Sequence, residues 1–316
     1  MKKLTQIDKF IEGAKVQGFY ICVKKFIRTT KGGDLYIDLE LQDMSGSIHG
    51  KIWDNASDLS LKFDKGDAVA VSGIVELYRE IFQLKINKIN RATKQYYGRY
   101  GFDPRKLVLS SKKDPYKMWK AVLNIIGELK NKELRRVIFL IYKENKNKII
   151  IKPSSINSSY NFRSGFLEQT LLIAQLAKKV APFYNLDKDL VIGGVLLIKI
   201  GVIKQIKSGY ISDSSKEGHL LGQPILGRDI LNKAIKKLKN FPEDLKIKLE
   251  HIIISHENNY QPTTSYRPSF PEALFIHSIY KMDSNMKLME QIILGDSDEN
   301  EFTNIHNHFR LPILKI

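Results

Sequence analysis

The chain has 316 residues, of which 43% are hydrophobic and 27% charged, a composition typical of folded globular domains and not of a disordered chain. No apolar run reaches the roughly 18 to 20 residues needed to cross a bilayer, and no apolar segment follows the basic start "MKKLTQ" as it would in a signal peptide. The formal net charge of +17 favours a polyanionic partner such as nucleic acid.

The first 92 residues show the period-two alternation of half-buried strands. In "DLYIDLELQD" (34–43) the residues that alternate onto one apolar face are Leu35, Ile37, Leu39 and Leu41. "SGSIHGKIWD" (45–54) repeats the pattern, and further strands are expected at 15–27, 67–77 and 80–90, where parity places Phe82 in the core with Leu84 and Ile86. One short helix is expected in "NASDLSLKF" (55–63). Five strands with a helix between the third and the fourth predict an OB-fold barrel over residues 1–92, a fold often used to bind single-stranded nucleic acid.

A basic linker is expected over residues 93–115. Residues 93–117 carry seven Lys or Arg against two Asp or Glu, and aromatic and cationic side chains alternate in Tyr96, Tyr97, Arg99, Tyr100 and Arg105. Such side chains can stack on bases and pair with phosphates. They can equally well pack against a neighbouring domain, and the sequence leaves both readings open.

From Pro115 the apolar period becomes helical. Asp114 is a plausible N-cap with Pro115 at the first helical position, and further helices are expected at 132–145, 164–182, 187–206, 217–239, 243–256 and 270–290. An all-helical domain is therefore predicted over 116–300, followed by a C-terminal tail over 301–316. Within it, "GVLLIKIGVIKQI" (194–206) is apolar nearly all round, which makes Lys199 at its centre unexpected.

The order of these parts and several local strings resemble the YhaM family of 3′–5′ exoribonucleases. The resembling strings are "LQDMSGSIHGKIWD" (41–54), "FRSGFLEQTL" (162–171), "GGVLLIKIG" (193–201), "EGHLLGQ" (217–223), "HIIISHE" (251–257), "EALFIHSIYKMDSNM" (272–286) and "EFTNIHNHF" (301–309). The resemblance implies an α+β multidomain chain with an N-terminal five-stranded OB-fold barrel followed by an all-α HD-type phosphohydrolase domain.

HD domains hold one or two divalent cations between histidines and aspartates, and the cations activate a water that attacks the phosphodiester. The resemblance implies metal ligands at positions that carry other residues here, namely Gln169, Ile198, Lys199, Gln223, Glu257 and Tyr280. The ammonium of Lys199 reverses the sign of the charge expected beside a cation. We therefore expect no metal cofactor and no hydrolysis. Lys199 either holds a phosphate, with Arg163, Lys204 and Lys207 as neighbours, or only fills a vacated metal pocket.

The barrel carries the expected nucleic-acid surface. Tyr36 and Trp53 face outward on strands that should be adjacent, where stacked bases commonly bind. The residues expected around them are His49, Lys51, Arg79, Gln83 and Lys85, with Lys24, Lys25 and Arg28 following the strand backbone into the first hairpin. Trp53 has the alternative of covering the barrel end against the helical domain.

Cys22, the only cysteine, cannot form an internal disulfide and favours a reducing, cytoplasmic compartment. The sequence predicts a protein that binds single-stranded RNA or DNA and has lost its hydrolase activity. One alternative is an active 3′–5′ exoribonuclease with a rearranged Mn²⁺ or Mg²⁺ site at His219, His251, His256 and Asp283. Another is a protein-binding scaffold or homo-oligomeric subunit. Membrane binding is not expected, because no basic amphipathic helix stands out.

Overall fold

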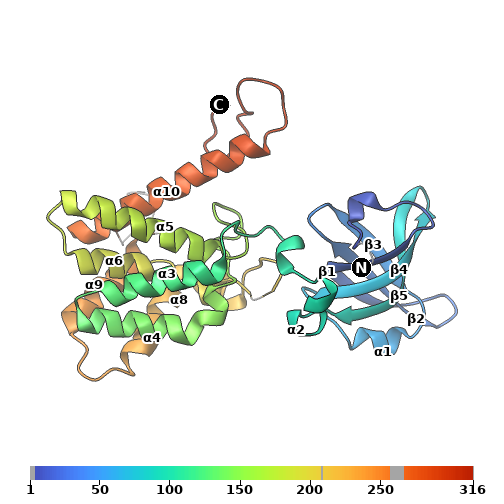
Figure 1. Ribbon diagram of the computed structural model, residues 1–316, viewed down its shortest axis with the longest axis horizontal. Coiled ribbons are helices and arrows are strands. Elements are labelled where there is room, and N and C mark those ends of the chain that lie inside the picture. Colours follow the sequence, from blue (N-terminus) through green and yellow to red (C-terminus); the bar gives the residue numbers. More distant parts are fainter. Residues whose placement is uncertain (1–3, 208, 257–266, 316) are drawn as a thin grey trace. The chain divides into compact units, whose positions relative to one another are not determined.

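The computed structural model describes residues 4–207, 209–256 and 267–315. The chain divides into two compact units (Figure 1). The barrel unit comprises Met1–Ser110 with Ser208–Ile211, and the helical unit comprises Ser111–Lys207 with Ser212–Ile316. Residues 93–110 thus belong to the barrel unit, where the sequence predicts a linker over 93–115. None of the helices in the described residues is long and apolar enough to span a bilayer.

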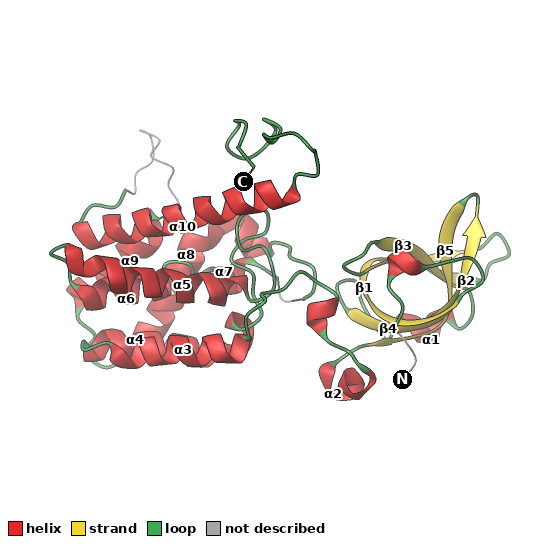
Figure 2. Cartoon of the chain, turned by 45° about the horizontal axis from the view of Figure 1, so that its top comes forward, coloured by secondary structure: helices red, strands yellow, loops and turns green. Residues whose placement is uncertain are grey.

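Five strands close into a barrel, which Figure 2 shows nearly end-on. The strands are β1 (Lys15–Thr29), β2 (Leu35–Gln42), β3 (Ser47–Ile52), β4 (Ala68–Tyr78) and β5 (Ile81–Arg91), with α1 (Ala56–Ser60) between β3 and β4. Their order around the barrel is β1-β2-β3-β5-β4, closed by pairing of β1 with β4, and only the β3–β5 pair is parallel. The OB-fold prediction is confirmed.

The alternation seen in the sequence sets the barrel core. Ile37, Leu39 and Leu41 are buried as predicted. Two predictions from parity are wrong, because Leu35 and Phe82 are exposed. Leu35 begins β2, and Phe82 lies one pair from the β4–β5 turn. At these strand ends a side chain that points to the inner side has no opposite barrel wall to pack against.

The segment after β5 folds back onto the barrel. It forms α2 (Lys94–Tyr97) and two short 3₁₀ turns, Gly98–Tyr100 and Pro104–Lys106. The rings of Tyr97 and Phe102 contact Phe19 of β1, with centroids 5.8 and 5.1 Å away. Phe102 is buried in a cluster beside the barrel wall. These aromatic contacts fix the segment on the barrel unit.

The helical unit packs its helices around one apolar core (Figures 1 and 2). The helices are α3 (Pro115–Glu128), α4 (Lys132–Ile149), α5 (Gly165–Val180), α6 (Lys188–Leu197), α7 (Val202–Gln205), α8 (Lys216–Ile235), α9 (Glu243–Ser255) and α10 (Pro271–Gly295). Asp114 caps α3 as expected, since its carboxylate accepts hydrogen bonds from the amides of Tyr116 and Lys117. The predicted helical content is confirmed.

The sequence predicts one continuous helix over 187–206, and this prediction is wrong for the apolar run 194–206. It breaks between α6 and α7, and Lys199 lies in the turn, half-buried. Gly201 ends this turn, and its backbone approaches the Gln223 carbonyl and the Gly227 nitrogen so closely that a Cβ would collide with both. This close approach joins segments far apart in sequence, and a run that is apolar all round carries no local sign of it.

Candidate functional site

Two aromatic rings form a platform on the outer face of the barrel. Ile37 of β2 pairs with Ile52 of β3, so the neighbouring Tyr36 and Trp53 lie next to each other outside the barrel. Their ring centroids are 4.9 Å apart with planes 24° from parallel, a stacked arrangement. Trp53 is 39% exposed. The structure therefore brings together the two aromatic residues that the sequence singles out.

The ammonium of Lys51 lies among three rings. Its Nζ is 5.8 Å from the centroid of Tyr36, 5.1 Å from that of Trp53 and 5.7 Å from that of Tyr78. The guanidinium of Arg79 lies 5.4 Å from the Tyr78 ring. We call Tyr36, Lys51, Trp53 and Tyr78 the aromatic platform. It presents π faces together with fixed positive charge, the combination that binds unpaired bases along a phosphate backbone.

Sequence reasoning missed two aromatic residues of this face. Tyr78 is exposed at the end of β4, and the same alternation that buries Val75 would have found it. Phe26 is exposed beneath the guanidinium of Arg28, 5.5 Å from its centroid. A shift in register between Cys22 and Lys24 reverses the strand parity before Phe26. Strict alternation from the buried Cys22 would have placed this ring inside the barrel.

The cations of the same face are largely paired with acids. Lys24 contacts Glu40 at 2.7 Å, Arg28 contacts Asp38 at 3.2 Å, and Lys85 contacts Glu76 at 3.9 Å. Exposed pairs of this kind contribute about 0–1 kcal/mol, so a phosphate can compete for the cations. Pairing of β3 with β5 places His49 opposite Gln83 and Lys51 opposite Lys85.

Lys25 does not belong to this face, contrary to the prediction. The register shift turns its side chain to the other side of β1, where its Nζ donates to the carbonyls of Ser60 (2.6 Å) and Phe63 (2.5 Å). The ammonium also lies 4.6 Å from the centroid of the Phe63 ring. Lys25 therefore holds the loop after α1 in place.

In the helical unit, Gln169 is at the centre of a buried polar network. Its Oε1 accepts hydrogen bonds from the hydroxyls of Ser154 and Tyr280, the latter at 2.9 Å. Its Nε2 donates to Asp283 Oδ2 at 3.0 Å and to Ser284 Oγ at 3.1 Å. A carboxamide has two acceptor lone pairs and two N–H donors. All four are used.

Asp283 is committed to the same network. Its Oδ1 accepts a hydrogen bond from the hydroxyl of Tyr160 at 3.0 Å, and its other oxygen accepts from Gln169. Burial raises the pKa of the Asp283 carboxyl. Both oxygens thus have protein donors in the part of the chain that is described.

His256 and Lys199 flank the ring of Tyr280. The imidazole of His256 meets that ring edge-on, with centroids 5.8 Å apart, and Lys199 Nζ lies 5.7 Å from the same ring. Burial, with the nearby charge of Lys199, lowers the pKa of His256 to about 3. Its Nδ1 lies 2.9 Å from the Ile253 carbonyl, so the neutral ring donates through Nδ1. The ammonium of Lys199 also repels a metal cation.

The positions at which the resemblance implies metal ligands therefore converge, while their side chains do not fit a divalent ion. Gln223 donates through Nε2 to the Ile198 carbonyl at 2.8 Å, and Glu257 lies outside the described residues. Within the described ranges, no group of three or more His, Cys, Asp or Glu side chains could hold a metal. The alternative set of His219, His251, His256 and Asp283 lies in these ranges and is therefore no such group.

The cations predicted as neighbours of a phosphate on Lys199 are Arg163, Lys204 and Lys207. Lys207 pairs with Asp213 at 2.8 Å, and Lys204 is exposed. Whether Lys199 holds a phosphate stays a prediction.

The comparisons with known proteins agree with both units. Residues 21–92 match the family described as an OB-fold nucleic acid binding domain. The 3′–5′ exoribonuclease YhaM of Bacillus subtilis is 28% identical over 302 residues, which cover 93% of this chain and 94% of that protein. This chain is a relative of the YhaM exoribonucleases. The resemblance inferred from the local strings is confirmed, and with it the architecture of an OB-fold barrel followed by a helical, HD-type region.

A second relative covers the same share of this chain, and a solved OB-fold domain aligns with a smaller share. YhaM of Bacillus licheniformis is 27% identical over 303 residues, covering 93% of this chain and 94% of its own. Among solved structures, the second OB-fold domain of replication protein A from Methanococcus maripaludis aligns at 23% identity over 29% of this chain and 97% of that domain, with a TM-score of 0.25.

The pKa of His256 predicts how the stability of the folded protein depends on pH. His256 is neutral in the fold but protonates near pH 6.5 in the unfolded chain, so its contribution is complete above 6.5 and is lost as the pH falls toward 3. The free energy of unfolding should then fall by up to about 1.4 kcal/mol for each pH unit in this window. Denaturant unfolding at pH 7 and pH 5 measures this fall in the free energy of unfolding. His256→Gln should flatten the dependence, and His219→Gln, at an exposed position, should not. An unchanged pH slope in His256→Gln would contradict the assignment.

Proposed function

We propose that this protein binds single-stranded nucleic acid, with RNA as the preferred class, through the aromatic platform, and that its helical unit does not hydrolyse the bound strand. The observation that carries the proposal is the stacked pair of Tyr36 and Trp53 with the Lys51 ammonium within 6 Å of both rings. We expect this to take place in a reducing, cytoplasmic compartment, because the lone Cys22 is buried and unbridged.

The platform suits an unpaired strand better than a duplex. Base stacking on an aromatic side chain contributes about 1–3 kcal/mol per base, and it requires a π face that paired bases do not expose. Because every base has such a face, we expect little sequence preference. RNA is favoured over DNA because the relatives over nearly the full length are named as exoribonucleases.

Loss of hydrolysis is supported by the chemistry of the substituted positions. Without a bound metal, no water in the site reaches a nucleophilic pKa near neutrality. Gln169 has all four of its hydrogen-bonding positions in use, and at Tyr280 a hydroxyl that donates to Gln169 stands where the family has a carboxylate. A divalent ion about 4 Å from the Lys199 ammonium would be repelled by roughly 8 kcal/mol at an effective dielectric near 20. Movement of the lysine side chain would reduce that figure.

Trp53→Ala tests the platform. The variant should bind a single-stranded oligoribonucleotide more weakly by about 1–3 kcal/mol, because one stacking surface is lost, and its melting temperature should change little. Fluorescence anisotropy titration gives the affinity. Tyr116→Ala, which removes an exposed ring from α3, is the control and should bind like the parent protein. A Trp53→Ala protein that melts early while its folded fraction binds normally would show that the ring serves packing instead.

The parent protein should leave a 3′-tailed oligoribonucleotide intact in excess Mn²⁺ or Mg²⁺. The double variant Ile198→His with Lys199→Asp should also be inactive, because Gln169, Gln223 and Tyr280 still replace the other family ligands. A denaturing gel over time measures the strand length, with Bacillus subtilis YhaM as the active comparison. Shortening from the 3′ end by the parent protein, abolished by His256→Ala, would overturn this part of the proposal.

A further inference from the structure

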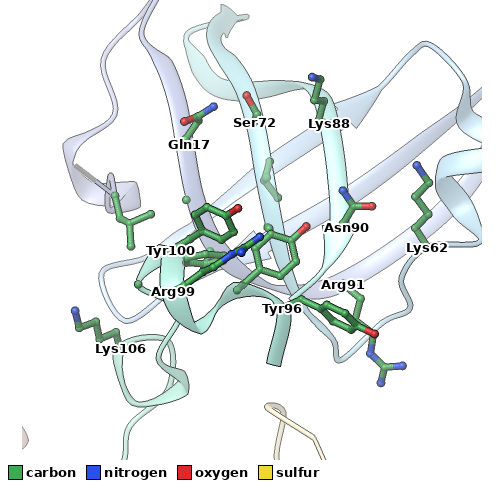
Figure 3. A pocket seen from close by; sticks show the side chains of 17 residues that line it. Gln17, Lys62, Ser72, Lys88, Asn90, Arg91, Tyr96, Arg99, Tyr100 and Lys106 are labelled. Atoms are coloured by element: carbon green, nitrogen blue, oxygen red, sulfur yellow. The ribbon is translucent and has the colours of Figure 1, made fainter. Parts of the chain in front are cut away.

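The barrel unit has a second surface that the aromatic platform does not use. A cavity of about 1360 Å³ lies between the wall formed by β1, β4 and β5 and the segment that follows β5. Figure 3 shows Tyr96, Arg99 and Tyr100 on that segment, with Gln17, Ser72 and Lys88 on the strands. No residue of the platform lines the cavity.

The charge of the cavity is positive without acidic partners in its lining. The cations that line it are Lys62, Lys88, Arg91, Arg99 and Lys106, and no Asp or Glu is among the lining residues. Arg91 pairs with Asp67 at 2.9 Å. For the other four, the described part of the chain contains no ion pair. On the face that carries the platform, by contrast, three cations contact acids, namely Lys24, Arg28 and Lys85. A phosphate entering the cavity therefore has little competition.

The aromatic residues around the cavity divide into anchors and exposed rings. Tyr97 packs on Phe19, whereas Tyr96 is 67% exposed and Tyr100 is 57% exposed. The guanidinium of Arg99 lies 4.8 Å from the centroid of the Tyr100 ring. The Tyr97 ring thus helps to hold the segment on the barrel. The rings of Tyr96 and Tyr100 stay exposed at the cavity, with the Arg99 guanidinium beside the Tyr100 ring.

The strand register supplies polar groups opposite those rings. Gln17 of β1 pairs with Ser72 of β4, and Ser72 pairs with Lys88 of β5, which makes one row across three strands. In the next row Ala70 pairs with Asn90. The first row combines the amide of Gln17, the hydroxyl of Ser72 and the ammonium of Lys88, groups that can bind the edge of a base and the adjoining phosphate.

We propose that this cavity is a second binding site for single-stranded nucleic acid, one that takes an unpaired nucleotide with its base on Tyr96 or Tyr100 and its phosphate on Lys88 and Arg99. The inference rests on the proposed function in one respect, because other nucleotides of the same strand would bind the aromatic platform. It assigns part of the salt dependence of binding to the cavity, because no Asp or Glu is among the residues that line it with Lys88 and Arg99.

The salt dependence of affinity tests this assignment. For single strands, log K changes with log salt by about 0.7 per phosphate contact. Because the proposed site places Lys88 and Arg99 on one phosphate, the double variant Lys88→Gln with Arg99→Gln should lower the magnitude of the slope by about 0.7 and the affinity at 0.1 M salt by roughly fivefold. The matched control, Lys120→Gln with Lys132→Gln, removes two exposed lysines from the helical unit and should leave the slope within error of the parent. A double cavity variant with the parental slope would contradict the proposal.

Crosslinking separates this inference from the proposed function. The full chain is irradiated with a uridine oligonucleotide carrying 4-thiouridine, and the crosslinked peptides are identified by mass spectrometry. We expect crosslinks both at the platform and between residues 94 and 106. Crosslinks at the platform alone refute the cavity site and leave the proposed function standing, whereas crosslinks at 94–106 alone refute the platform. A parent protein with no crosslink at either place refutes both.

Discussion

The hydrogen bonds of Gln169 determine what the centre of the helical unit can do. This one side chain joins α5 to α10 through Tyr280, Asp283 and Ser284, and it uses every donor and acceptor that it has. An ion could bind there only after some of these bonds broke, and each buried polar group left without a partner costs about 1–3 kcal/mol. The network therefore stabilises the fold around positions where the YhaM resemblance implies a metal. The positive charge of Lys199 opposes a cation at the same place.

In the proposed function, two surfaces of the barrel unit bind a polyanion, and their chemistry differs. The platform offers stacked rings around Lys51, and three cations near it, Lys24, Arg28 and Lys85, contact acids. The cavity offers cations that have no acidic partner in its lining, beside the exposed Tyr96 and Tyr100. Stacking is insensitive to salt and charge pairing is not. Both surfaces offer rings for bases, and the cavity adds cations that no acid in its lining neutralises.

The sequence predicts the parts of this structure that depend on local periodicity. Alternating apolar residues are enough to place the five strands, and with them Tyr36 and Trp53 on one face. Phe26 and Lys25 could not be placed, because a single register shift after Cys22 reverses which side of β1 each residue faces. The close approach of Gly201 involves residues more than twenty positions away in the sequence. The cavity combines β1, β4, β5 and the following segment, and the sequence indicates only its Tyr and Arg residues, not the strands that complete it.

Native mass spectrometry of the parent protein with a 3′-tailed oligoribonucleotide and Mn²⁺ tests the central claim most directly, because one spectrum reports binding, strand length and metal content together. The account predicts a complex whose mass is that of the protein plus the intact strand, without a stoichiometric metal ion, and it predicts that the strand keeps its length over hours. A protein that carries one or two metal ions and releases progressively shortened strands would contradict the account, and the helical unit would then be a working hydrolase.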